Sequence, residues 1–179
     1  MSAVAVPGLV RPLRGRQSRF ALTGALFLFG GAAEAQMPAS GRVANVEKAA
    51  AEIAVIQEQK GNDGAEAAIK ACYDRELPKA KELTPALEIC MAQDIIIAKI
   101  SAGFYANVSK NLSEEQRKKA GIPNPADVTK AMADRIYAVL SKLKVPEPDA
   151  RAFSQIVQTK GMEAFARARF PKEFPSRPQ

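Results

Sequence analysis

The sequence predicts an all-α fold, a single compact multi-helix bundle of about six helices with one disulfide bracing an antiparallel helical hairpin. Three observations lead to this prediction. Capping residues, prolines and glycines divide the chain into segments with apolar residues at helical spacing. No segment shows the alternating pattern of a strand. The only two cysteines, Cys72 and Cys90, lie at matched distances from a predicted connection between two helices.

The N-terminal segment has the order of a secretory signal peptide. An apolar run, residues 20–33, is followed by Ala33-Glu34-Ala35 and is 14 residues long, whereas a membrane-spanning helix needs about 20. We expect cleavage after Ala35, which leaves a helical domain over residues 36–170, an irregular tail over residues 171–179 and no transmembrane anchor. The basic residues before the apolar run are Arg11, Arg14, Arg16 and Arg19.

An organelle transit peptide is the alternative, because no acidic residue precedes Glu34. The compact apolar block favours secretion, since transit peptides are usually amphipathic. We therefore expect a periplasmic or secreted protein. Its net charge falls from +7 to +4 when residues 1–35 are removed. This mild excess suits a protein partner or an anionic envelope component, and it lacks the clustered basic stripe of a nucleic-acid binder.

The first half of the mature chain contains three predicted helices. Residues 42–60 carry apolar side chains at helical spacing, and Gly61-Asn62-Asp63 ends that helix and caps the next, over residues 65–77. Thr84 as N-cap and Pro85 at the first helical position then begin the longest helix, which extends to about residue 112.

The second half contains shorter helices. A capping box at residues 113–116 begins a helix that Gly121 closes. Asn124 and Pro125 begin the next, over residues 125–143, and residues 150–160 form another that ends at Gly161. A last short piece covers residues 162–170. Five aromatic residues are expected mainly in the core: Phe104, Tyr105, Tyr137, Phe153 and Phe165.

The longest helix should be the centre of the bundle, because residues 95–100, IIIAKI, leave it little polar surface. On a helical wheel, Asp94 and Ser101 fall on the inward stripe and Glu88 falls on the polar side. A buried carboxylate needs a partner. We expect Asp94 to be buried and to pair with a cation such as Arg135 or with a tyrosine; a ligand-facing acid is the alternative.

The two cysteines are predicted to form a structural disulfide. Their spacing of 18 differs from the Cys-x-x-Cys of redox sites. Cys72 lies five residues before the expected helix end and Cys90 five residues after the next helix start. Such positions face each other in an antiparallel hairpin, within the ~4.4–6.8 Å between Cα atoms that a disulfide needs. Two separately buried thiols are the alternative.

The residue types that are missing argue against several classes of enzyme. The chain has no histidine and no tryptophan, which removes Ser-His-Asp and Cys-His nucleophilic sites, histidine-ligated haem and the usual catalytic zinc sets. It also lacks a glycine-rich phosphate loop. We predict no catalytic residue, no metal and no cofactor.

These observations favour a small exported non-catalytic protein that acts as an interaction or binding module of the periplasm or cell envelope. A carboxylate-dependent hydrolase of an envelope polymer is one alternative, which an inward-facing acid pair in a cleft would support. A helical bundle that binds an apolar ligand is the other, which a sizeable cavity beside Tyr105 would support.

Overall fold

The computed structural model describes residues 39–174, and within them it contains helices and no strand, so the predicted all-α fold is confirmed. The expected signal peptide, its cleavage after Ala35 and the end of the expected tail lie outside the described residues. The elements are α1 (Ala39–Glu76), α2 (Pro85–Val108), α3 (Glu114–Lys119), α4 (Pro125–Lys142), α5 (Glu147–Ile156), the π-helix η1 (Val157–Gly161) and α6 (Met162–Arg169).

Helix α2 is the central helix of the bundle. The α1, α4 and η1 elements all pack against it, and its Met91, Ala92 and Ile96 side chains are fully buried. By length and composition α2 could cross a membrane, but most of its apolar part is buried under the other described helices. The nearly all-round apolar sequence of α2 is thus explained by burial on several sides.

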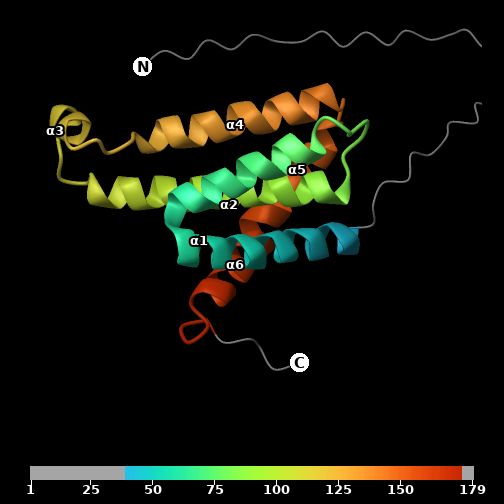
Figure 1. Ribbon diagram of the computed structural model, residues 1–179, viewed down its shortest axis with the longest axis horizontal. Coiled ribbons are helices and arrows are strands. Elements are labelled where there is room, and N and C mark those ends of the chain that lie inside the picture. Colours follow the sequence, from blue (N-terminus) through green and yellow to red (C-terminus); the bar gives the residue numbers. More distant parts are fainter. Residues whose placement is uncertain (1–38, 175–179) are drawn as a thin grey trace, which may run out of the picture. The chain divides into compact units, whose positions relative to one another are not determined.

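Helix α1 joins the two predicted helices of residues 42–60 and 65–77 in one element that bends at Gly61 (Figure 1). Gly61 has φ 69° and ψ −169°, a backbone conformation that is essentially restricted to glycine. The predicted helix boundary therefore lies at a real bend. The bend directs the second half of α1 along α2 toward α4, where it forms one wall of the groove described below.

Replacing Gly61 by alanine is expected to lower the free energy of unfolding by about 1–3 kcal/mol, because a side chain disfavours this conformation. No neighbour lies within 4 Å of the added Cβ, so the loss reflects backbone strain alone. Gly103→Ala is the matched control, since Gly103 lies in α2 with equally open space; alanine should stabilise that helix by about 1 kcal/mol. Urea unfolding measures both. Equal effects of the two substitutions would contradict the strain at Gly61.

Gly161 has a different role from the one its position in the sequence suggests. The prediction that it ends a helix is wrong, because α5, η1 and α6 run on without a break and Gly161 keeps helical dihedral angles, φ −64° and ψ −48°. A Cβ atom at this position would lie 3.0 Å from Val46 Cγ1 and 3.3 Å from Ile96 Cδ1. An added side chain would therefore crowd Val46 and Ile96, and glycine permits the close approach of η1 to α1 and α2.

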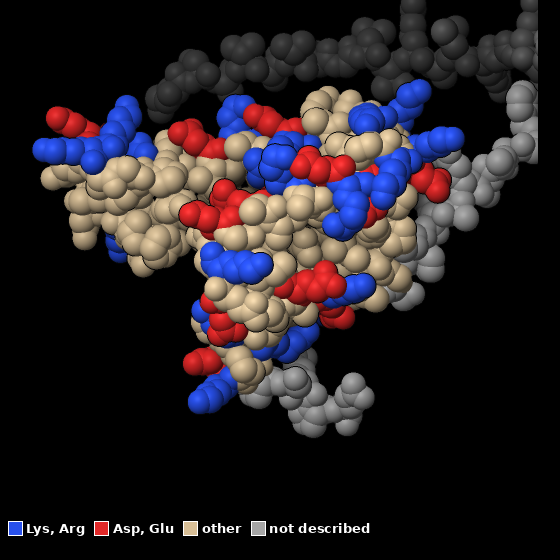
Figure 2. All heavy atoms as spheres, viewed as in Figure 1, with Lys and Arg blue, Asp and Glu red and all other residues tan. Residues whose placement is uncertain are grey.

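The aromatic residues divide between core and surface. Phe153 and Phe165 are buried as expected, whereas Phe104 is 56% and Tyr137 74% exposed, so the core prediction is wrong for these two. The last turns of α2, which carry Phe104, extend toward α3 beyond the bend of α1 (Figure 1). Basic and acidic side chains are interspersed on the face of α1 and α4 and at α3, and uncharged surface predominates along the last turns of α2 (Figure 2).

Candidate functional site

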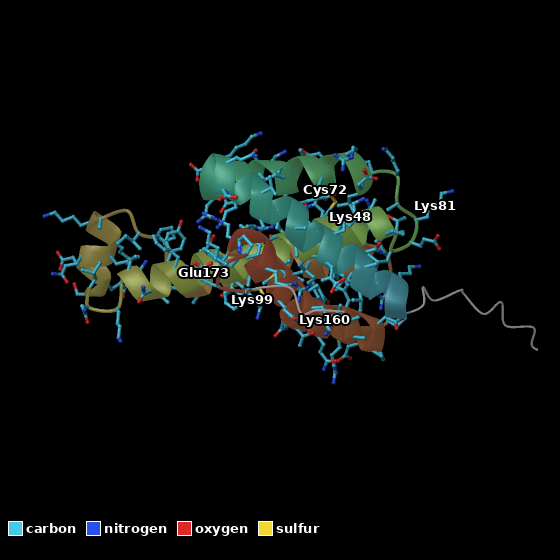
Figure 3. All side chains as sticks on the ribbon, turned by 90° about the horizontal axis from the view of Figure 1, so that it is seen from below. Lys48, Cys72, Lys81, Lys99, Lys160 and Glu173 are labelled. Atoms are coloured by element: carbon cyan, nitrogen blue, oxygen red, sulfur yellow. A yellow bond between two sulfur atoms is a disulfide. The ribbon has the colours of Figure 1, made fainter. Side chains whose placement is uncertain are left out.

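The disulfide between Cys72 and Cys90 joins the end of α1 to the start of α2, with the two Cα atoms 5.6 Å apart (Figure 3). Both cysteines are buried, and no free cysteine remains among the described residues. The disulfide is thus the predicted brace of a helical hairpin. Such bonds persist in oxidising compartments, which indicates a location outside the cytoplasm.

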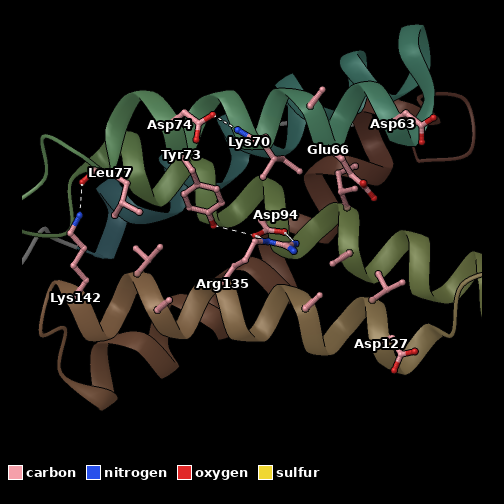
Figure 4. A pocket seen from close by; sticks show the side chains of 18 residues that line it. Asp63, Glu66, Lys70, Tyr73, Asp74, Leu77, Asp94, Asp127, Arg135 and Lys142 are labelled. Carbon is pink, nitrogen blue, oxygen red and sulfur yellow. Dashed lines mark hydrogen bonds and ion pairs between the residues drawn. The ribbon is translucent and has the colours of Figure 1, made fainter.

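A groove lies between the second half of α1 and α4 (Figure 4). Both helices pack against α2 but make almost no direct contact with each other, so α2 forms the floor of the groove. Its volume is about 1090 Å³, slightly above the range of ligand sites, roughly 300–1,000 Å³. An apolar cavity was expected beside Tyr105 if the bundle holds a ligand; the groove lies beside Tyr73 instead.

Small side chains leave the groove open. Alanines line its walls and floor, where longer side chains would close the space between the helices. Beneath them Ile69, Ile97 and Val139 are at most 5% exposed and form an apolar base. The lining alanines are Ala67, Ala98, Ala131 and Ala138.

A polar cluster occupies the middle of the floor. The Asp94 side chain on α2 is only 2% exposed, and Arg135 on α4 donates to both its carboxylate oxygens, with Nη2–Oδ1 at 2.6 Å and Nε–Oδ2 at 3.0 Å. The Tyr73 hydroxyl on α1 donates to the same Oδ2 at 3.3 Å. The structure therefore brings together Asp94, Arg135 and a tyrosine from three helices (Figure 4).

The electrostatics of this cluster keep Tyr73 neutral and Arg135 positively charged. Burial, together with the neighbouring Asp94 carboxylate, raises the pKa of Tyr73 well above its ordinary value. The hydrogen bonds to Asp94 raise the pKa of Arg135. Asp94 carries three hydrogen bonds on its two oxygens, so the cluster is a structural link between helices and leaves no free carboxylate on the floor to act as a base.

The raised pKa of Tyr73 predicts a loss of stability in alkali. A tyrosine in the unfolded chain ionises near pH 10, whereas folded Tyr73 keeps its proton to higher pH. The contribution of protonated Tyr73 to the free energy of unfolding is therefore complete below about pH 10. Above that pH it is lost at up to about 1.4 kcal/mol per pH unit. Tyr73→Phe should be less stable than the native protein at pH 8, by about 0.5–1.5 kcal/mol. Urea unfolding from pH 8 to pH 11 should show that the difference in stability between the native protein and Tyr73→Phe becomes smaller. A constant difference would contradict the raised pKa of Tyr73.

The two ends of the groove differ in charge. At one end Lys142 donates to the Leu77 carbonyl oxygen at 3.2 Å and links α4 to the end of α1. At the other end three carboxylates lie on the two walls, and none of them forms an ion pair with a described residue. These three are Asp63, Glu66 and Asp127 (Figure 4).

A second buried polar cluster was not predicted. Glu88 was expected on the polar side of its helix, but it is fully buried, so that expectation is wrong. Arg42 donates to Glu88 Oε1 at 2.6 Å and Asn45 to Oε2 at 2.9 Å. Both partners come from the first turns of α1, which cover this face of α2. The cluster is separate from the groove lining.

A smaller hollow of about 610 Å³ lies beside Gly61 and Phe104. The one basic side chain in its lining, Arg169, pairs with Glu58 at 2.9 Å. This hollow offers mainly aromatic and aliphatic surface without a set of converging polar groups. The groove between α1 and α4 is therefore the better candidate site.

Within residues 39–174 no group of three or more histidine, cysteine, aspartate or glutamate side chains is placed to hold a metal ion. Comparisons with protein-family models, with curated proteins and with solved structures give no match to this chain. The groove and its charges are therefore the features that indicate a function.

Proposed function

We propose that the chain is a small exported, non-catalytic binding protein of the periplasm or cell envelope, and that the groove between α1 and α4 is its binding site. The observation that supports this proposal most is the groove itself. It has the size and the largely apolar lining of a ligand site, with a few charged groups at defined positions.

Two features support the proposed compartment. The disulfide requires an oxidising environment to persist, and the first 35 residues have the order of a signal peptide. An exported protein with one braced hairpin and an open apolar groove is well suited to hold a molecule that water solvates poorly.

The state of Asp94 supports binding over hydrolysis. Two-carboxylate hydrolysis needs one free carboxylate and one proton-donating acid across a cleft. Asp94 at the groove floor is held by Arg135 and Tyr73, and the chain has no histidine to take its place. The remaining unpaired acids of the groove, Asp63, Glu66 and Asp127, are exposed to water, whereas the proton-donating acid of such a pair is typically shielded from it.

A neutral apolar dye tests the groove as a binding site. N-phenyl-1-naphthylamine should gain fluorescence when it binds the native protein, because it leaves water for an apolar surface. Ala131→Trp fills the groove and should abolish the gain. Ala133→Trp is the matched control, since Ala133 lies on the same helix, is exposed and does not line the groove.

The proposal fails if Ala131→Trp and Ala133→Trp bind the dye equally well while circular dichroism shows both variants folded. That result would place the dye elsewhere on the surface. Absence of dye binding by the native protein would also contradict the proposal.

A further inference from the structure

We infer that the ligand of the groove is a cationic amphiphile, an elongated apolar molecule with one positively charged head group, whose head lies at the end that carries Asp63, Glu66 and Asp127. This inference rests on the proposed binding function and adds the chemical class and the orientation of the ligand.

The shape of the groove fits an elongated molecule. Its walls run over residues 63–76 of α1, with Leu77 directly after them, and residues 127–142 of α4, which at 1.5 Å per residue corresponds to about 20 Å of helix on each side. Apolar and small side chains line it along this length, with Leu77 and Val139 toward one end and Val128 toward the other. One alkyl chain or a narrow ring system can lie along such a surface and be shielded from water.

The charges along the groove are strongly uneven. Its lining contains five carboxylates and three basic side chains, although the chain as a whole carries +7. All three basic groups already have partners within the fold. Lys70 pairs with Asp74 at 2.6 Å, Arg135 pairs with Asp94 at 2.6 Å, and Lys142 donates to a backbone carbonyl.

The three remaining carboxylates define where a head group would lie. Asp63 and Glu66 come from α1 and Asp127 comes from α4, and all three lie at the same end of the groove, with Glu66 between the two helices and the other two nearer the outer sides of theirs (Figure 4). A positive head group there would gain attraction from both sides, and an anionic one would be repelled. The expected charge of the ligand is thus positive, whereas the total charge of the chain alone suggested an anionic partner.

Three probes with the same dodecyl chain separate the role of the head group from that of the chain. Dodecyltrimethylammonium, dodecyl maltoside and dodecyl sulfate are titrated below their micelle concentrations against the dye-loaded protein as it is recovered after export. We expect the cationic probe to displace the dye about tenfold more tightly than the neutral one, since two exposed charge contacts of about 0.5–1 kcal/mol each give this ratio. The anionic probe should bind most weakly.

Two variants with equal net charge locate the head group. Asp63→Asn combined with Glu66→Gln and Asp127→Asn should reduce the preference for the cationic over the neutral probe to about onefold or twofold. Glu114→Gln combined with Glu115→Gln and Glu147→Gln removes the same charge from exposed positions away from the groove. This control should keep the preference. Equal losses in both variants would mean a general charge effect and would overturn the inference.

Different results would contradict the cationic ligand and the groove as a binding site. If the neutral or anionic probe displaces the dye as tightly as the cationic one, the ligand class is wrong and the groove remains a binding site. If dye binding is insensitive to Ala131→Trp, the binding site itself is wrong. Tighter displacement by a helical Leu/Lys amphipathic peptide than by dodecyltrimethylammonium would replace the small amphiphile by a peptide ligand.

Discussion

Replacing both Cys72 and Cys90 by alanine is expected to lower the free energy of unfolding by about 2–4 kcal/mol. The bond joins α1 to α2 across the connection between them, so its loss gives the unfolded chain more freedom and leaves the packing of the two helices largely in place. The dye-binding groove should therefore persist at temperatures where the variant is still folded. Urea unfolding measures the change in stability.

Reduction provides the control for this prediction. Dithiothreitol should destabilise the native protein by about the same amount as the double substitution, and it should not affect the variant. Titration of the native protein under denaturing, non-reducing conditions should detect no free thiol. Two reactive thiols per chain would contradict the disulfide and would also remove the argument for an oxidising compartment.

The features that the sequence predicted correctly depend on local patterns or on short loops. Thr84 and Pro85 begin α2 as expected, with Thr84 accepting from the Leu87 backbone N–H at 3.2 Å, and Ser113 forms the predicted capping box of α3. The disulfide follows from the same information, because a short connection favours antiparallel packing of the two helices that it joins. Local chemistry therefore accounts for most helix boundaries and for the hairpin.

The position of Asp94 could also be predicted from the pattern, since a charged residue on the apolar stripe of a central helix has few possible surroundings. Its partner Arg135 lies 41 positions further along the chain, and only the apolar stripe of the next long helix indicated which cation would approach. This pair is the part of the candidate site that could be predicted from the sequence.

The groove could not be predicted, because it depends on two helices that make almost no direct contact with each other. No pattern in residues 63–77 or 127–142 predicts how far apart α1 and α4 lie on α2. The alanines of both segments would equally allow α1 and α4 to pack directly against each other. Gly161 is a similar case, since a glycine that ends a helix and a glycine that permits close packing look alike in sequence. In both cases tertiary distances decide the outcome.

Glu88 was misplaced because a helical wheel assumes that a helix has one buried side. In α2 nearly every residue from 87 to 98 is buried, and only Ile89 is partly exposed. The N-terminal turns of α1 cover the face on which Glu88 lies and supply Arg42 and Asn45 as its partners. A charged residue in such a run is a reason to search the sequence for a cation that can be buried with it.

Replacing Arg42 by methionine is expected to have the largest effect of the substitutions considered, a loss of about 3–5 kcal/mol in the free energy of unfolding. Glu88 is fully buried and Arg42 is its only basic partner within 4.0 Å among the described residues, at 2.6 Å. Methionine keeps most of the aliphatic volume but leaves the carboxylate without a counter-charge in an apolar surrounding. The loss therefore reflects the unpaired charge rather than a cavity.

Two further variants separate this effect from general loss of charge. Lys48→Met removes a cation from the same helix, but Lys48 and Glu52 form an exposed pair at 3.9 Å, so it should change stability by at most about 0.5 kcal/mol. Combining Arg42→Met with Glu88→Leu should recover most of the stability, because no buried charge is left unpaired and apolar groups of similar volume often replace buried ion pairs without loss. Urea unfolding of the three variants at pH 7 provides the comparison. If Arg42→Met costs no more than Lys48→Met, Glu88 does not depend on Arg42 for its burial, and the packing of the first turns of α1 on α2 must be stabilised by apolar contacts alone.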